Sequence, residues 1–180
     1  MKKILTLAAA LLSFGLFAET ERQEILNDNS FNTVTNYWCA NSGHMKRKPG
    51  GKIFKGATGG RSGSCMRITC TDSGIASLFS RALIPFTHAT DTIKCSIWVK
   101  GKGSFRFGFY LYAEKGRGFR GMYYAPKVTV DSKEYKKYDF VFPCSKFAAK
   151  AKTARLSIDV SKAADLYFDD FSGVKESIVK

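Results

Sequence analysis

Aromatic side chains alternate with small and basic residues in two neighbouring stretches of the chain. Residues 93–100 read IKCSIWVK, and residues 104–112 read SFRFGFYLY. Neighbouring residues of a β-strand point to opposite faces. The alternation therefore separates a face of Phe, Ile and Val from a face that carries Trp98, Tyr110 and Tyr112.

This second face has the composition of a sugar-binding surface. Sugar rings have apolar C–H faces that stack on aromatic rings, and Tyr and Trp suit half-wetted positions because each ring carries a polar group. Lys94 and Ser96 add hydrogen-bonding groups beside the rings. The candidate ligand-binding residues are Trp98, Arg106, Tyr110 and Tyr112. The alternative is that Trp98 or Tyr110 belongs to a second buried layer.

Catalytic motifs are missing from the sequence. It contains no GxSxG, HExxH or P-loop motif. A glycosidase needs two carboxylates about 5–10 Å apart across a cleft. Asp169 and Asp170 cannot form that pair, because adjacent residues of a strand point to opposite faces. We therefore predict a protein that is not an enzyme.

The same alternation recurs along most of the chain and predicts the fold class. Seven or eight short strands at roughly ten-residue spacing are typical of an all-β sandwich or barrel. Turn residues are expected to separate them at 101–103, 116–121, 131–132 and 161–162, and residues 41–64 are expected to form the longest loop. The expected strands are 65–70, 76–79, 93–100, 104–112, 128–130, 138–142, 155–160 and 166–171.

The N-terminus has the pattern of a secretory signal peptide. Lys2 and Lys3 precede an uncharged, mostly apolar run of 14 residues, and Ala18 is followed by a polar chain. The run is too short for a membrane span, which needs about 20 residues. We therefore predict a signal peptide over residues 1–18, a single domain over 19–180, a secreted or periplasmic location and no transmembrane segment.

The chain is strongly basic, with 29 Lys and Arg against 15 Asp and Glu and a formal charge of +14. Removal of the signal peptide takes away Lys2 and Lys3 and no acid, which lowers this charge to +12. Nucleic acid is not the usual partner of an exported protein, so we expect no nucleic-acid binding. Acidic glycans or an anionic envelope surface are the expected partners.

Export also permits disulfides among the five cysteines. A bridge between Cys65 and Cys70 is excluded, because five residues of strand span about 16 Å and bridged Cα atoms lie roughly 6 Å apart. Cys70 and Cys95 face inward by strand parity, either as a bridge or as small buried hydrophobes.

The order of motifs along the mature chain resembles a known family. The sequence LNDNSFN at 26–32 is followed by Trp38, a Gly-rich stretch at 59–64, the strand ending in WVKG at 98–101, and LYFDDF at 166–171. This order is similar to carbohydrate-binding modules of the galactose-binding-like jelly-roll type, the xylan- and glucan-binding modules of bacterial polysaccharide-degrading enzymes. The resemblance implies an all-β, two-sheet antiparallel β-sandwich.

The resemblance also implies a structural calcium ion (Ca2+) beside the last strand. Asp169 would be one ligand and the segment 27–32 would supply others, with Asn32 at the position where the family commonly has Glu. The amide of Asn32 lowers the local negative charge relative to the family, and calcium prefers several oxygen ligands. The alternative is that Asp169, Asp170 and Asn32 only bond to backbone groups and lysines at the strand ends.

Composition, motifs and resemblance together predict a secreted, non-catalytic polysaccharide-binding protein with a preference for acidic glycans. The alternative is a structural or protein-interaction module of the cell envelope, because a fold does not decide a function. A separate glycan-degrading enzyme or the envelope surface would then be its partner.

Overall fold

The computed structural model describes residues 19–28, 37–61, 63–86 and 88–179. The predicted signal peptide (1–18) and Asn32 lie outside these residues. The described chain is built almost entirely of strands, with one helix, α2 (Ser42–Arg47), and one 3-10 turn, η1 (Cys144–Lys146). The strands are β1 (Glu19–Asp28), β2 (Trp38–Ala40), β3 (Gly51–Ala57), β4 (Cys65–Cys70), β5 (Ile75–Ser80), β6 (Ile84–Pro85), β7 (Thr92–Glu114), β8 (Arg117–Tyr124), β9 (Val128–Pro143), β10 (Thr153–Ser161) and β11 (Ala164–Val179).

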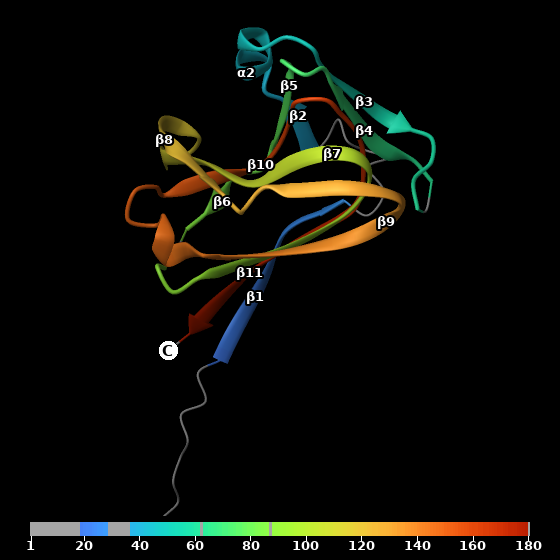
Figure 1. Cartoon of the computed structure of the whole chain (residues 1–180). Coiled ribbons are helices and arrows are strands. Elements are labelled where there is room, and N and C mark those ends of the chain that lie inside the picture. The colour runs from blue at the N-terminus through green and yellow to red at the C-terminus, as the bar shows by residue number, and fades with distance from the viewer. Residues whose placement is uncertain (1–18, 29–36, 62, 87, 180) are drawn as a thin grey trace, which may run out of the picture.

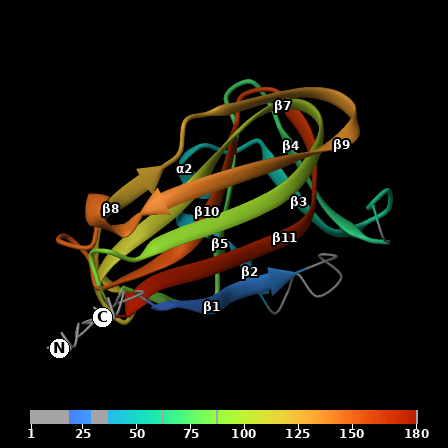
Figure 2. The same ribbon diagram turned by 90° about the horizontal axis from the view of Figure 1, so that it is seen from below.

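The strands form two packed antiparallel layers, as predicted (Figure 1). The first layer contains β3, β4, β11, the first half of β7, and β9, with β1 along the end of β11. Figure 2 shows β9, β7, β11 and β1 lying side by side in it. The second layer contains β2, β5, β10, the second half of β7, and β8, with β6 beside β10.

A single long strand, β7, belongs to both layers. The sequence predicts two strands separated by a turn at 101–103, and this prediction is wrong: β7 runs without a break from Thr92 to Glu114. Gly101 and Gly103 bend it, with φ of 115° and 144°. A Cβ on Gly101 would lie 2.1 Å from the carbonyl oxygen of Asp165, so only glycine allows β11 to approach this closely.

Three other local predictions are also corrected. Residues 117–121 of the turn predicted at 116–121 belong to β8, and the turn lies at Lys115 and Gly116. Residues 41–64 are not one long loop, because α2 and β3 lie within them. Asn41 begins the helix, since its side chain accepts a hydrogen bond from the backbone N–H of His44. Residues 131–132 lie inside β9, where the predicted turn is absent. The predicted turn at 161–162 is present, with Lys162 at φ 64°.

The core between the layers is made of phenylalanines from the inward faces of β7, β9 and β11. Phe107 lies 4.8 Å from Phe140 and Phe109 lies 4.8 Å from Phe142, measured between ring centroids, and both pairs join the two layers. Trp38 meets Phe171 edge-on at 5.5 Å. Each fully buried ring contributes roughly 1.5–3 kcal/mol through removal of apolar surface from water. The prediction that the Phe, Ile and Val face of residues 93–112 points into the core is therefore confirmed.

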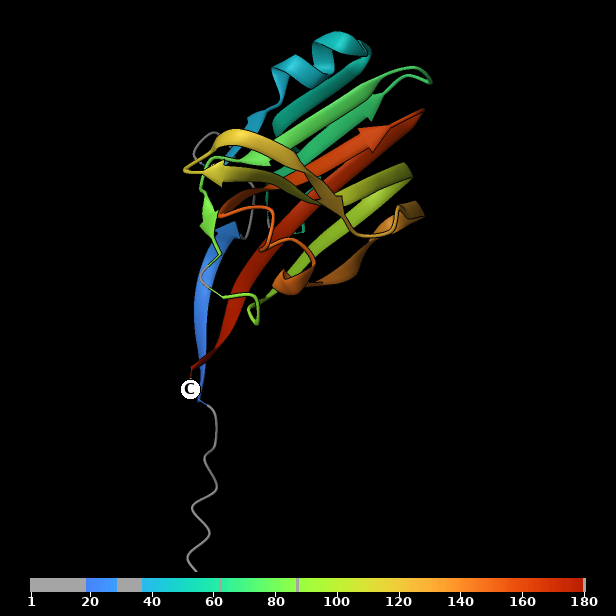
Figure 3. The ribbon, with the colours of Figure 1, turned by 90° about the vertical axis from the view of Figure 1, so that its left-hand side faces the viewer.

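All five cysteines have free thiols, and four of them are buried. Cys70 and Cys95 are predicted to form a disulfide or to be small buried hydrophobic residues, and the structure shows the second of these roles. Among the described residues, no helix has the length and apolar character needed to cross a bilayer. At the opposite end from α2, β1 and the end of β11 form a two-stranded ribbon that runs to the C-terminus (Figure 3).

Candidate functional site

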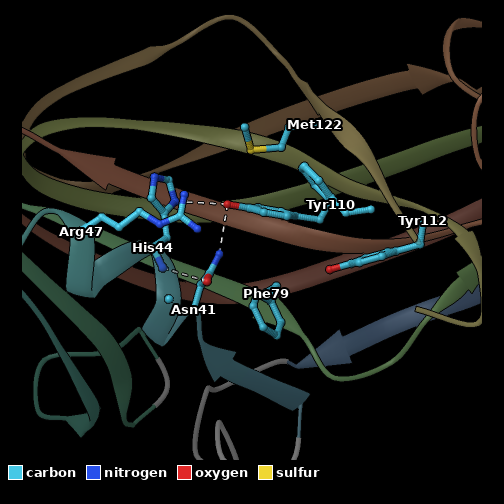
Figure 4. Close-up of a pocket in the computed structure, with 9 residues that line it drawn as sticks. Asn41, His44, Arg47, Phe79, Tyr110, Tyr112 and Met122 are labelled. Atoms are coloured by element: carbon cyan, nitrogen blue, oxygen red, sulfur yellow. Dashed lines mark hydrogen bonds between the residues drawn. The ribbon is translucent and has the colours of Figure 1, made fainter. Parts of the chain in front are cut away.

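A pocket of about 360 Å³ opens on the outer face of the second layer, between α2 and the ribbon of β7 and β8. Tyr110 and Tyr112 of β7, two of the predicted binding residues, both line it (Figure 4). The register of β7 against β10 places both side chains on the face opposite the Phe core. The other lining residues are Asn41, Gly43, His44, Arg47, Phe79, Phe119 and Met122.

Helix α2 holds the hydroxyl group of Tyr110 in place. The amide Nδ2 of Asn41 donates to Tyr110 Oη at 3.1 Å, and His44 Nδ1 lies 3.2 Å from the same oxygen (Figure 4). Burial raises the pKa of Tyr110 above its usual value, and the nearby Asp159 carboxylate raises it further, so the phenol stays neutral. Tyr110 is therefore a fixed wall of the pocket.

The rim of the pocket is apolar and open to solvent. Phe119 is 56% exposed and Met122 is 50% exposed. Phe119 lies 5.8 Å from the Tyr110 ring and 6.3 Å from the Tyr112 ring, between centroids. Large apolar side chains this exposed, gathered around a hollow, make this surface a candidate for ligand binding.

A buried carboxylate supports the sheet next to the pocket. Asp159 of β10 accepts hydrogen bonds from Ser77 Oγ at 2.5 Å, from Ser157 Oγ at 3.2 Å and from Tyr124 Oη at 2.5 Å. These bonds fix β5, β10 and β8 to one another on the outer face of the layer. They also give the buried carboxyl group of Asp159 the hydrogen-bond partners that a polar group needs away from water.

Arg106, also a predicted binding residue, lies on the same outer face but does not line the pocket. It is exposed and stands beside Asp159 in the β7–β10 register. Its predicted role in ligand binding stays a prediction, for a ligand that extends from the pocket along β7.

Trp98 is the predicted binding residue that the structure places elsewhere. It lies on the first half of β7, in the first layer, between Asp169 of β11 and Lys137 of β9. The bend in β7 separates it from Tyr110 and Tyr112. Its ring is half-buried and lies under the guanidinium group of Arg61, 3.7 Å from the ring centroid.

Asp169, the predicted calcium ligand, is fully buried. Its Oδ2 accepts the backbone N–H of Arg61 at 2.6 Å, and its Oδ1 accepts the backbone N–H of Asp170 at 2.9 Å. Burial raises the pKa of Asp169 above its usual value, and the two backbone hydrogen bonds oppose that shift.

The residues that the structure describes do not make up a metal site by themselves. Within them there is no cluster of three or more His, Cys, Asp or Glu side chains that could hold an ion. The other predicted ligand, Asn32, and the side chains of the segment 27–32 lie outside the described part of the chain. The structural calcium stays a prediction.

Sequence reasoning missed most of the pocket, because only Tyr110 and Tyr112 of its nine lining residues were predicted. Asn41, His44, Arg47 and Phe79 come from a stretch predicted as loop and from a short strand. One signal was available for the helix: Asn41 followed by a helix-compatible run is an N-cap pattern. Nothing in the sequence shows that this helix would lie beside Tyr110, which is 69 residues away.

The chain matches no family model and no curated protein, but its fold matches solved structures. It is similar to the xylan-binding CBM22-1 domain of Xyn10C from Paenibacillus barcinonensis, with 15% identity, a TM-score of 0.55, and coverage of 88% of this chain and 96% of that one. It is equally similar to a family 11 carbohydrate-binding module from Clostridium thermocellum solved with a β-1,3-1,4-mixed-linked tetrasaccharide, with 15% identity, a TM-score of 0.54, and coverage of 88% and 96%.

In other matched structures, the part that is similar to this chain belongs to a longer protein. The chain spans 28% of the N-terminal part of the Clostridium thermocellum endo-1,4-β-D-xylanase 10B, a CBM22-1 and GH10 structure with bound xylohexaose, at 15% identity and a TM-score of 0.54. By its tertiary structure, this chain therefore has the β-sandwich fold of carbohydrate-binding modules of families 22, 11 and 29.

Proposed function

We propose that this chain is an exported, non-catalytic protein that binds a polysaccharide in the pocket between α2 and the β7–β8 ribbon. The observation that carries the proposal is the combination of exposed rings and fixed polar groups in one hollow. Phe119 and Tyr112 offer flat surfaces for the C–H faces of sugars, and Asn41 and Arg47 offer hydrogen-bond donors for hydroxyl groups. Pockets with apolar walls and a few placed polar groups are typical ligand sites.

The charge around the pocket favours an acidic polysaccharide. Arg47 lines the pocket and Arg106 lies on the same outer face; among the described residues, neither makes an ion pair. All six ion pairs between described residues involve side chains of the first layer or of the loops connected to its strands. The guanidinium groups of Arg47 and Arg106 can therefore bind carboxylate and sulfate groups through paired donors.

The predicted signal peptide supports a location outside the cytoplasm for such a protein. There it would act on glycans of the envelope or beside a separate glycan-degrading enzyme. In both cases the polysaccharide binds in the same exposed pocket. The two cases differ only in whether the envelope or the enzyme keeps the protein near its ligand.

The proposal is tested by affinity gel electrophoresis in xylan, mixed-linked β-glucan and polygalacturonate, with a matched pair of variants. F119A removes an exposed ring at the pocket. F54A removes one of similar exposure, 43%, from the first layer. We expect retardation of the wild type and of F54A, and loss of retardation in F119A. Absence of retardation by every glycan would overturn the proposal, and equal retardation by neutral and acidic polymers at low salt would overturn the acidic preference.

A further inference from the structure

A second hollow of about 510 Å³ lies between β8 and the turn that links β9 to β10. Four alanines and three cations line it, the cations being Arg120, Lys150 and Lys152. All three cationic residues are exposed. Alanine side chains leave the floor open, so a group can approach the cations without displacing bulky side chains. We call this hollow the alanine pocket.

The alanine pocket lies where two acid-free segments meet. Residues 115–130 and 140–158 each contain four Lys or Arg and no Asp or Glu. Tyr123 packs on Phe147 at 5.2 Å between ring centroids, and the backbone N–H of Gly116 donates to Thr153 Oγ1 at 3.3 Å, so the fold brings the segments together. The structure thus brings basic residues of both segments to one hollow, Arg120 from the first and Lys150 and Lys152 from the second.

No ion pair between described residues neutralises these cations, because the six such pairs include none of the eight basic residues of the two segments. Like charges that gather without counter-charges repel one another and oppose folding. An anionic ligand at this end would relieve that repulsion, which gives the patch a physical reason to bind one.

The alanine pocket and the first pocket lie on opposite faces of the same ribbon. In β7, Tyr112 lines the first pocket and its neighbour Ala113 lines the second; in β8, Phe119 lines the first and Arg120 lines the second. Strand alternation is the reason for this arrangement. In the described residues β8 pairs only with β7, so its outer edge is the path between the two pockets.

We propose that the alanine pocket is a separate anion-binding subsite that takes a carboxylate or sulfate group of an acidic polysaccharide. The inference rests on the proposed polysaccharide binding and assigns the acidic preference to particular residues. The same polymer, passing over the edge of β8, stacks a sugar on the rings of the first pocket and places a charged group against Arg120, Lys150 and Lys152.

The test compares two triple variants with equal loss of charge. R120Q/K150Q/K152Q changes the alanine pocket. K52Q/K133Q/K136Q removes three exposed lysines from the first layer. Circular dichroism and thermal unfolding establish that both are folded. Binding to dextran sulfate, polygalacturonate and neutral xylan oligosaccharides is measured over a range of NaCl concentrations.

We expect the alanine-pocket variant to bind both acidic polymers about tenfold more weakly at low salt, with a shallower dependence of affinity on NaCl. Its binding to neutral oligosaccharides should equal that of the wild type, and the first-layer variant should stay within about twofold of the wild type for every ligand. Equal loss in the two triple variants would overturn the inference, since net charge alone would then explain it.

Two further results separate the possible failures. If F119A and the wild type both bind no neutral glycan while the acidic polymers still need Arg120, Lys150 and Lys152, the proposed sugar pocket fails and the anion subsite stands. If sodium sulfate displaces the acidic polymers far better than sodium chloride of equal ionic strength, the subsite takes a free inorganic anion, and its assignment to the polysaccharide is overturned.

Discussion

The guanidinium group of Arg61 lies 3.7 Å from the centroid of the Trp98 ring and covers its outer face. The same group is paired with the carboxylate of Asp170, and the backbone N–H of Arg61 donates to Asp169. One loop residue therefore ties the 59–64 stretch to both β7 and β11. A cation stacked on an aromatic ring contributes about 0.5–2 kcal/mol, depending on its exposure to water.

Removal of this guanidinium in R61A should uncover Trp98 and lower the free energy of unfolding by about 1–2 kcal/mol. Trp38, the other tryptophan, is fully buried, so increased acrylamide quenching of native fluorescence reports on Trp98. R106A is the matched control, because Arg106 is exposed and stacks on no ring among the described residues. Unchanged quenching in R61A would contradict the stacking.

Loss of the Tyr110 hydroxyl in Y110F should lower the free energy of unfolding by about 0.5–1.5 kcal/mol, because Asn41 Nδ2 and His44 Nδ1 lose their shared partner. Y112F is the matched control: within the described residues, the Tyr112 hydroxyl makes no hydrogen bond. Urea unfolding measures both variants. Equal stability of Y110F and Y112F would show that α2 is not held through Tyr110.

The phenol of Tyr124 should make stability depend on alkaline pH. Burial raises its pKa well above the usual value, and the Asp159 carboxylate raises it further. In the unfolded chain the phenol ionises near pH 10 and in the folded chain at higher pH, so this contribution is complete below pH 10 and is lost as pH rises above it. The stability advantage of the wild type over Y124F should therefore shrink above pH 10. An advantage that stays constant up to pH 11 would contradict this.

The predicted calcium ion can be tested through Asp169. If the ion is bound there, EDTA should lower the midpoint of thermal unfolding and added Ca2+ should restore it, because an ion that binds only the folded state stabilises that state. D169N should be insensitive to both treatments. If the unfolding midpoint of the wild type does not change with EDTA or Ca2+, the prediction of a structural calcium ion is wrong.

The four buried cysteines should be unreactive while the protein is folded. Burial raises the pKa of Cys144 to about 12 and that of Cys95 further, and only the thiolate attacks alkylating reagents. Iodoacetamide at pH 8 should leave the buried thiols unmodified, and all five should react after denaturation without a reducing agent. A mass deficit of about two protons in the native protein would instead reveal a disulfide.

Alternation in the sequence was enough to predict an all-β fold and the residues of its core. The alternation of residues 93–112 correctly assigns Phe105, Phe107 and Phe109 to the interior, because every second residue of a strand points to the same face. It also correctly puts Tyr110 and Tyr112 on the outer face. It could not show that Gly101 and Gly103 bend a continuous strand, since glycine suits a turn and a bend equally well.

The bend in β7 determines which of the predicted binding residues lie together. Trp98 and Tyr110 share the outer face of one strand, yet they belong to different layers, and their neighbours come from segments far away in the sequence. Arg61 reaches Trp98 from a Gly-rich stretch, and Asn41 reaches Tyr110 from a short helix. Strand parity is a local property and was readable from the sequence. The partners of each side chain are set by non-local pairing of strands, so only the tertiary structure could decide them.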